Sequence, residues 1–299
     1  MNDDRPRLRL AYLLTVATAA TMTTVSAVGV FAADWLYRDN ALITATFRGQ
    51  DMVTLVVAVP LLLVGLVWEM RGSLRGRVLW LGMLFYSMYA YLFYAVGAAF
   101  NPFFLLYVAT FGLPLYALLF SVPRLDLIQL GSAMGGRVAR VVAITYTGVV
   151  AAGLGLLWVG ISLSYLVTDA VPQPIVDSGH PTGVVFAIDL VFIVPPMLLA
   201  ALWLARRRPL GRLLAGVMSV GGSVYTLTLA AASVEVARQN VGAGSELPIW
   251  AALTVLGAVT VALLFAGIRR PDGSEAPTGA QAAGAGARSA SGRERRVVQ

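Results

Sequence analysis

Asp189 is the residue of this sequence whose surroundings most clearly indicate chemistry. It lies in the apolar run "GVVFAIDLVFIVPP", seven residues after Thr182, where we expect a helix to begin. An aspartate facing lipid at that depth costs about 3 kcal/mol, so its side chain should point into a helical bundle. There it could bind a cation, a proton or a small ligand, or it could simply accept hydrogen bonds from a neighbouring Tyr, Ser or Thr.

A second group of polar side chains lies in "LFYSMYAYLFYAVGAAFN" (residues 84–101), which holds four tyrosines within nine residues. This number exceeds what an interfacial aromatic belt needs, and buried phenols require hydrogen-bond partners. We predict a tyrosine-lined polar pocket that opens to the outside, with ordinary packing between helices as the alternative. The predicted ligand-binding residues are Asp189, Tyr86, Tyr89, Tyr94, Asp51 and Glu235.

Metal and thiol chemistry find little support in the sequence. The chain has one histidine and no cysteine, which excludes disulfides, thiolate catalysis and iron–sulfur ligation. His180 and the scattered carboxylates form no metal-ligand spacing such as H-E-x-x-H. We therefore predict no metal site and no cofactor, and interpret His180 as a loop residue that caps a helix or faces water.

The composition indicates which solvent surrounds these residues. Hydrophobic residues make up 58% of the 299 residues and charged residues only 12%, with a mean hydropathy of +0.78. Soluble domains carry roughly 25% charged residues, so lipid must face much of this chain. The sequence thus predicts an all-α, polytopic transmembrane helical bundle.

Eight apolar stretches are long enough to cross a membrane, since about 20 residues rising 1.5 Å each span a core of about 30 Å. The predicted transmembrane domain covers residues 11–268. Its spans lie near residues 11–33, 52–70, 78–99, 103–122, 141–166, 184–205, 213–236 and 249–268.

Arginine placement predicts how the bundle is oriented. Nineteen of the 22 arginines fall at the termini or in alternate loops, and the other loops hold only Arg38, Arg48 and Arg238. By the positive-inside rule both termini are cytoplasmic, in the inner membrane of a bacterium whose GC-rich coding is indicated by the absence of lysine. The net charge of +7 then indicates topology and contact with membrane lipids, rather than nucleic-acid binding.

The two ends of the chain carry further predictions. Residues 1–10 are predicted to be a cytoplasmic segment, although "VGVFAADW" also fits the end of a cleaved signal peptide, which would leave seven spans. Residues 269–299 are rich in Gly, Ala, Ser and Arg and are predicted to form a disordered cytoplasmic tail. The tail either contacts anionic headgroups or only fixes the topology.

An internal duplication is suggested when residues 59–79 are laid on residues 194–214, a shift of 135. The chain would then consist of two parallel four-helix repeats, an arrangement found in some transporters. The alternative is that any inward-turning hairpin collects these residue types. The identities pair Val59, Pro60, Trp68, Arg71, Gly76, Arg77 and Leu79 with Val194, Pro195, Trp203, Arg206, Gly211, Arg212 and Leu214.

The transmembrane block resembles a group of uncharacterised multi-pass bacterial membrane proteins whose function is unassigned. The resemblance covers about residues 45–215 and rests on "RGQDMVTLVVAVPLL", "RGSLRGRVLWLG", "AAFNPFFLLYV" and "GHPTGVVFAIDLVFIVPP". It implies the same membrane architecture and transfers no activity and no functional residue.

Motif absences narrow the function further. The chain has no GxxxxGK[ST] for nucleotides, no GxSxG elbow and no lysine for a Schiff base, so no signature favours an enzyme. The leading hypothesis is the binding or transport of a small solute. The alternatives are a membrane-embedded enzyme that uses Asp189 with Glu235 or Asp51 as acid and base on a lipid or isoprenoid, and a structural or assembly subunit. The sequence does not indicate an oligomeric state.

Overall fold

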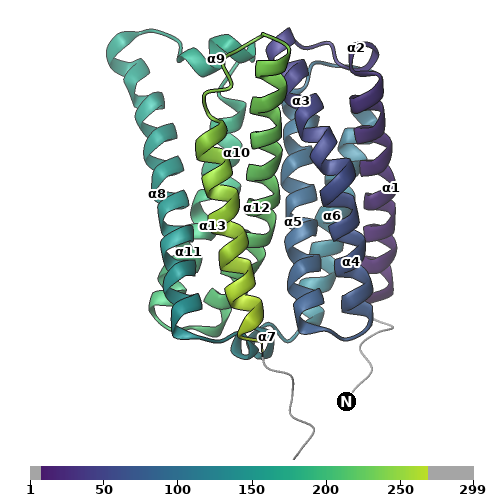
Figure 1. Cartoon of the computed structure of the whole chain (residues 1–299), viewed down its shortest axis with the longest axis vertical. Coiled ribbons are helices and arrows are strands. Elements are labelled where there is room, and N and C mark those ends of the chain that lie inside the picture. Colours follow the sequence, from purple (N-terminus) through teal and green to yellow (C-terminus); the bar gives the residue numbers. More distant parts are fainter. Residues whose placement is uncertain (1–7, 269–299) are drawn as a thin grey trace, which may run out of the picture. The chain divides into compact units, whose positions relative to one another are not determined.

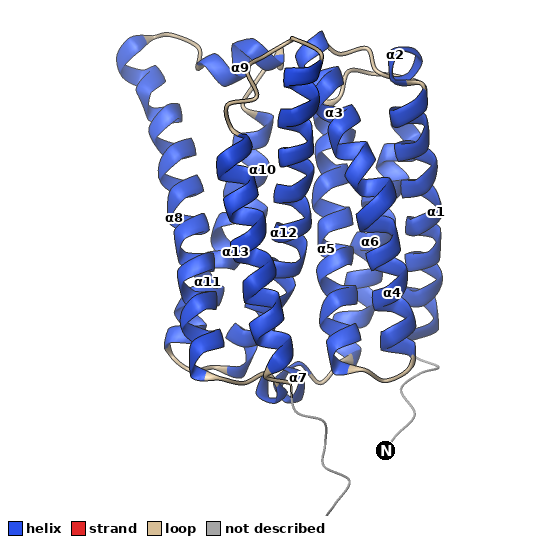
Figure 2. Ribbon diagram, in the orientation of Figure 1, coloured by secondary structure: helices blue, strands red, loops and turns tan. Residues whose placement is uncertain are grey.

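The computed structural model describes residues 8–268, and every regular element among them is a helix. Most of the predicted amino-terminal segment and the predicted tail at residues 269–299 lie outside this range. Within residues 8–268, eight helical segments are long and apolar enough to cross a membrane, which confirms the all-α, multi-pass prediction (Figure 1, Figure 2). They are α1 (Arg9–Phe31), α3 with α4 (Ala41–Val53, Val59–Met70), α5 (Leu74–Gly97), α6 (Phe104–Ser121), α8 (Arg137–Thr168), α10 with α11 (Val184–Phe192, Val194–Ala205), α12 (Pro209–Arg238) and α13 (Leu247–Ala266).

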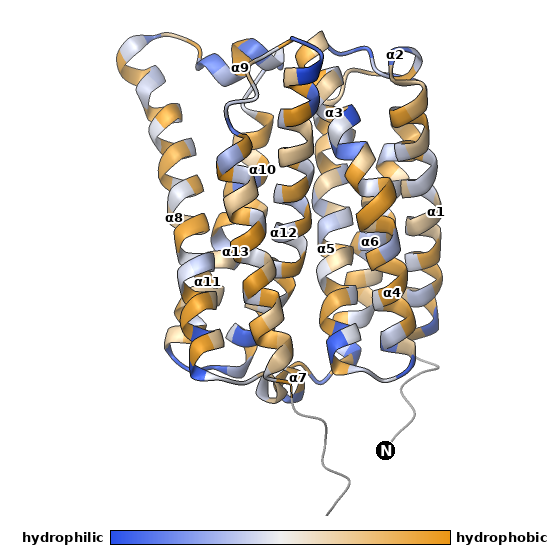
Figure 3. Ribbon diagram, in the orientation of Figure 1, coloured by the Kyte–Doolittle hydropathy of each residue, from blue (hydrophilic) through white to orange (hydrophobic). Residues whose placement is uncertain are grey.

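Charged residues separate to the two ends of these spans, while apolar residues dominate between them (Figure 3). The end that carries the short helix α7 (Leu127–Ala133) and the turns after α4 and α11 is called the arginine face. The opposite end carries the short helices α2 (Ala33–Leu36) and α9 (Gln173–Ser178) and is called the acidic face. The acidic-face loops and helix ends contain Asp34, Asp39, Asp169, Asp177 and Glu246.

Two of the eight spans are interrupted, and each interruption precedes a proline. In the second span a π-helix at Thr54–Ala58 separates α3 from α4, whose second residue is Pro60. In the sixth span α10 ends at Phe192, before Pro195 and Pro196. Proline lacks the amide donor that a helix interior needs, which explains why both helices are broken there.

The second span begins earlier than the sequence pattern predicted. Asn40 caps α3, because its side chain accepts a 2.9 Å hydrogen bond from the amide of Ile43, and the helix continues from Ala41 to the π-helix. Arg48 and Asp51 therefore lie inside a helix, although the predicted span near residues 52–70 left both of them outside. Their predicted position was wrong because the polar stretch around them resembles a loop.

The helix boundaries follow the predicted duplication. A shift of 135 residues carries the bounds of α4 (Val59–Met70) onto those of α11 (Val194–Ala205), and the first residue of α5 onto that of α12. The turns between these helices also correspond, since Gly72 and Arg207 both have positive φ, at 78° and 57°. Each turn is also closed by the same hydrogen bond between residues five apart. The amide of Ser73 donates to the carbonyl of Trp68, and the amide of Arg208 donates to the carbonyl of Trp203.

The tight contact after each turn repeats as well. A Cβ on Gly76 would lie 2.3 Å from Cβ of Trp68, and a Cβ on Gly211 would lie 2.8 Å from Cβ of Trp203. Only glycine allows the two helices of each hairpin to approach this closely. The shared bounds, turns and contacts lie in the α4–α5 and α11–α12 hairpins, whereas the bounds of α1, α3 and α6 do not match those of α8, α10 and α13 at this shift. Two parallel four-helix repeats therefore stay a prediction, and the first and last four spans are called the first and second repeat below.

The two repeats meet at α5 and α12, which pack against each other and are the most buried spans. Helices α1, α4 and α6 accompany α5, and α8, α11 and α13 accompany α12 (Figure 1). Contacts of α3 with α12 and of α10 with α5 cross between the repeats. The central helices thus bring together side chains from both interrupted spans.

The repeats differ at the acidic face. The first span, α1, has buried residues along its whole length, up to Gly29. Its counterpart α8 has none beyond Ala151, and its end leans away from the neighbouring helices (Figure 1). Leu166 and Val167 there are 77% and 88% exposed, and α13 has no buried residue before Gly257. In this half of the second repeat, many apolar side chains of α8 and α13 are exposed, although Trp158 still contacts α10 and Thr254 still contacts α12.

Candidate functional site

Four carboxylates are buried in the described part of the chain, and two of them are paired with arginine. Glu69 accepts bonds of 3.0 and 2.9 Å from Arg77, across the turn between α4 and α5. Glu235, near the end of α12, lies 3.6 Å from Arg48 and 3.4 Å from Arg238. Because their charges are balanced, these two acids are explained by structure alone.

Asp189 has no such cation. Its carboxylate accepts a hydrogen bond from the hydroxyl of Tyr89 on α5 and one of 2.8 Å from Nε1 of Trp158 on α8. The ring of Tyr225 on α12 lies edge-on to Tyr89 with centroids 4.7 Å apart. Only neutral donors therefore hold this acid, and it is 6% exposed.

Trp158 belongs to the exposed half of α8 and contacts Asp189 from there. Its indole stacks on Phe186 of α10 at a centroid distance of 4.2 Å, and no residue of α8 after Ala151 is buried. A Cβ added at Gly153 or Gly160 would meet no other atom within 4 Å. The Asp189 site therefore lies at the edge of the part of the bundle where packing ends.

Asp51 is the second buried acid without a cation. It accepts hydrogen bonds from the hydroxyl of Tyr37, in the loop after α2, and from that of Tyr94 at 3.2 Å. A Cβ on Gly29 of α1 would lie 1.8 Å from Oδ2 of Asp51, so the acid occupies space that only glycine leaves free. Asp51 is fully buried beneath Tyr37 and does not stand at an exposed rim.

The tyrosines of α5 fill the interior of the bundle. Tyr86 shares a 2.7 Å hydrogen bond with Thr54 at the start of the π-helix, and Tyr91 shares one of 3.2 Å with Ser26 of α1. Tyr86, Tyr89, Tyr91 and Tyr94 are each at most 3% exposed. This burial is what the packing alternative expects, and the tyrosine-lined pocket stays a prediction.

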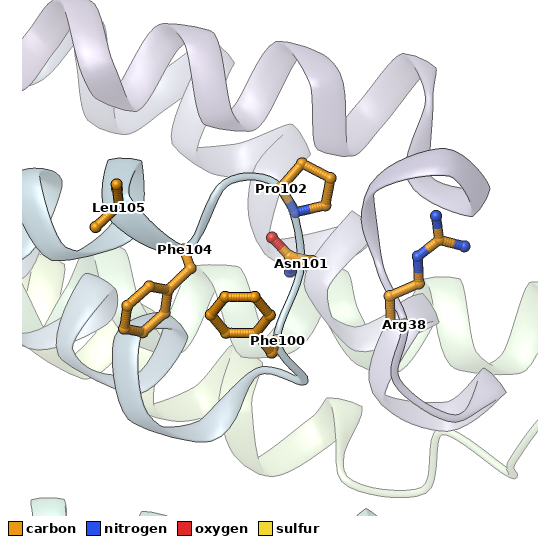
Figure 4. A pocket seen from close by; sticks show the side chains of 6 residues that line it. All are labelled: Arg38, Phe100, Asn101, Pro102, Phe104 and Leu105. Atoms are coloured by element: carbon orange, nitrogen blue, oxygen red, sulfur yellow. The ribbon is translucent and has the colours of Figure 1, made fainter.

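The predicted ligand-binding residues separate into three places. Asp189 lies with Tyr89, Asp51 lies with Tyr94, and Glu235 lies with its arginines. Tyr89 and Tyr94 are five residues apart on α5, so they project about 140° apart around the helix axis. A surface pocket on the acidic face is lined instead by Arg38, Phe100, Asn101, Pro102, Phe104 and Leu105 (Figure 4).

The loops of the acidic face are joined by hydrogen bonds between the repeats. Asn40 donates a 2.9 Å bond to the carbonyl of Asp177, and Nε2 of His180 lies 2.8 Å from the carbonyl of Gly97. His180 is thus half-buried and bonded to the end of α5, and it does not simply face water. Among the described residues no three metal-ligating side chains gather into a metal site.

The partners Tyr37 and Trp158 were missing from the sequence-based site. Each is distant in the chain from the acid that it contacts, and nothing in the sequence around it indicates the contact. Glu69 was also missed, although an acid eight residues before Arg77 across an inward turn is a recognisable signal.

Comparison of the chain with protein-family models, with curated proteins and with solved structures finds no match. The chain is a multi-pass integral membrane protein on its own structural features.

Proposed function

We propose that this protein binds and carries a small lipophilic solute with a cationic group, and that the solute binds at Asp189. The observation that carries the proposal is a buried carboxylate held by neutral donors alone, next to the part of α8 that leaves the bundle. Intramembrane acids without a structural partner mark solute or ion pathways. A cation at Asp189 would supply the missing positive charge.

The aromatic side chains around Asp189 suit an organic cation better than a metal ion. Trp158 and Tyr89 both bond to Asp189, and they pack on Phe186 and Tyr225 respectively. Aromatic faces attract alkylated ammonium and similar groups, and desolvation strengthens this attraction to about 2 kcal/mol. The apolar remainder of the solute would lie against the exposed residues of α8 and α13.

The route into the site follows from the same exposed half. A lipophilic solute concentrates in the membrane, so it would approach Asp189 laterally, between the acidic-face halves of α8 and α13. By the positive-inside rule the acidic face is the outer one, which would make this the outer leaflet of the inner membrane. This route replaces the tyrosine-lined outward pocket suggested by the sequence.

The enzyme and subunit hypotheses receive less support. An acid–base pair needs two carboxyl groups that converge on one substrate. Asp189 and Asp51 bind tyrosines on different sides of α5, and Glu235 is held by Arg48 and Arg238. A purely structural subunit would have no need for two buried acids without cations.

The proposal is tested by the equilibrium binding of tetraphenylphosphonium, a lipophilic cation, to the full chain in lipid nanodiscs. Asp189→Asn keeps the size of the side chain and removes its charge, and we expect it to weaken binding by at least about tenfold. Asp177→Asn, on the acidic-face helix α9, is the matched control and should bind as wild type does. Equal affinity in wild type and Asp189→Asn would contradict the proposal.

A further inference from the structure

Asp51 presents a separate question, because the same fold neutralises its other acids differently. Arg48 lies one turn before Asp51 on α3 and would be a natural partner, yet it pairs with Glu235. The groups that face Asp51 from the neighbouring elements are all uncharged. They are Ser26 of α1, Tyr37 of the loop, Tyr86, Tyr91 and Tyr94 of α5, and Tyr107 of α6.

We propose that Asp51 is a proton-binding site of the bundle, which exchanges its proton with the acidic face when Tyr37 moves aside. An ionised carboxylate in such surroundings would be an unpaired charge in a medium of low dielectric constant, which is strongly unfavourable. A protonated carboxyl group, in contrast, can both accept from Tyr37 and Tyr94 and donate to a neighbouring hydroxyl oxygen.

Tyr37 is the movable part of this site. Among the described residues it is the only hydrogen-bond partner of Asp51 that comes from a loop, while Ser26 and Tyr94 belong to spans. Burial and the nearby Asp51 raise the pKa of the Tyr37 phenol well above its usual value, so it remains a neutral donor. Its ring packs on Phe47 of α3 with centroids 5.0 Å apart.

The space above Asp51 leaves room for the Tyr37 hydroxyl and little else. A Cβ on Gly29 would lie only 2.6 Å from that hydroxyl, so α1 passes directly beside it. Two hydrogen bonds hold the loop that carries Tyr37. Asn40 donates to the main-chain carbonyl of Asp177, and Asp39 accepts a hydrogen bond of 2.9 Å from the amide of Ala99. Breaking these loop contacts would let Tyr37 move away and expose Asp51.

Hydroxyl groups lie next to each of the two acids. Thr54 follows Asp51 by one turn and shares a 2.7 Å hydrogen bond with Tyr86. Tyr225 packs on Tyr89, the partner of Asp189. The π-helix that begins at Thr54 is a wide turn of the kind found at functional sites. Coupling of the proton to a solute at Asp189 rests on the proposed function, whereas proton binding at Asp51 does not.

Infrared difference spectroscopy of the full chain in nanodiscs, with isotope-labelled aspartate carboxyl groups, tests the proton site. Because Asp189 is also buried among neutral donors, we expect protonated aspartate bands at neutral pH from both acids. The Asp51 component should be lost in Asp51→Asn and kept in Asp189→Asn and Asp177→Asn. Should Asp51→Asn fail to fold, Tyr94→Phe retains the acid and removes a donor, so the band should shift. Absence of a protonated band, or a band that neither variant changes, would overturn the proposal.

The rate at which the Asp51 carboxyl proton exchanges for deuterium in heavy water, followed by the shift of that band, tests the role of Tyr37. Tyr37→Ala should exchange about tenfold faster than wild type, because a lost hydrogen bond of about 1.4 kcal/mol changes an opening equilibrium by that factor. An unchanged exchange rate would refute the proposal that movement of Tyr37 controls access to Asp51. The Asp51 band should persist in Asp189→Asn, so a failure of the solute site and a failure of the proton site give different results.

Discussion

Nε1 of Trp158 donates a 2.8 Å hydrogen bond to the carboxylate of Asp189, and this bond joins α8 to α10 near the point where α8 leaves the bundle. Among the described residues, the contact joins a buried acid to a tryptophan on the exposed part of α8. On the proposed lateral route, a solute would meet this indole before it pairs with Asp189. The relationship therefore connects the packing difference between the two repeats to the proposed binding site.

Replacing Trp158 by phenylalanine should destabilise the protein. The Trp158→Phe variant keeps a ring to stack on Phe186 but removes the donor, which leaves the Asp189 carboxylate with Tyr89 alone. We expect a loss of about 1–3 kcal/mol in the free energy of unfolding, measured in detergent. Trp35→Phe is the control, because that side chain is 53% exposed, and it should change stability by less than about 0.5 kcal/mol. Equal effects of the two substitutions would argue against a special role for Trp158.

A methyl group at Gly29 should disturb the Asp51 site. In Gly29→Ala the new Cβ would fall 1.8 Å from Oδ2 of Asp51, so the acid or Tyr37 must move. Overpacking of this kind costs about 1–3 kcal/mol in the free energy of unfolding. Gly112→Ala on α6 is the control, because a Cβ there meets no atom within 4 Å and alanine favours the helix. A stable Gly29→Ala variant would mean that the site is looser than described.

The stability of the acidic-face loops should depend on pH through Asp39. Burial raises the pKa of this carboxyl group above its ordinary value of 3.8, although the amide of Ala99 and the nearby His180 act to lower it. Because the folded chain holds this proton more tightly than the unfolded chain, the contribution of Asp39 to stability is largest below about pH 4 and decreases as pH rises through the folded-state pKa. Thermal unfolding midpoints of wild type and Asp39→Asn, compared over this range, measure the effect. A wild-type advantage that grows with pH would contradict it.

The absence of cysteine makes the predicted orientation directly testable. Single cysteines can be placed at Asp177 on the acidic face and at Asp126 on the arginine face. If the positive-inside rule holds here, a membrane-impermeant maleimide added to whole cells should label Asp177→Cys at once and Asp126→Cys only after permeabilisation. The reverse pattern would place the acidic face in the cytoplasm and would move the proposed solute route to the inner leaflet.

The composition and the lengths of the apolar stretches were sufficient to predict the all-α, eight-span architecture. Apolar length set the eight spans, and the shift of 135 residues anticipated that α4 and α11 share both of their bounds. The start of the second span was mistaken because "RDNALITATFRGQD" combines polar residues with a helix that is buried against α12. Asn40 followed by an apolar residue was the available helix-start signal.

The candidate site was less predictable because it depends on contacts between distant segments. The position of Asp189 in an apolar run indicated a buried acid, and tyrosine was anticipated as a partner type. Its second donor, Trp158, is 31 residues away, and Tyr37 reaches Asp51 from a loop. Pairing of this kind follows from how helices pack, which the residue pattern of a single span does not determine.

The charge preference of the Asp189 site tests the central claim most directly. Tetraphenylphosphonium and tetraphenylborate are close in size and shape and opposite in charge, so their affinities for the full chain in nanodiscs, corrected for binding to empty nanodiscs, isolate the electrostatic part. We predict that wild type prefers the cation by at least about tenfold and that Asp189→Asn loses this preference. A preference of equal size in wild type and Asp189→Asn would contradict the assignment of Asp189 as the solute-binding acid.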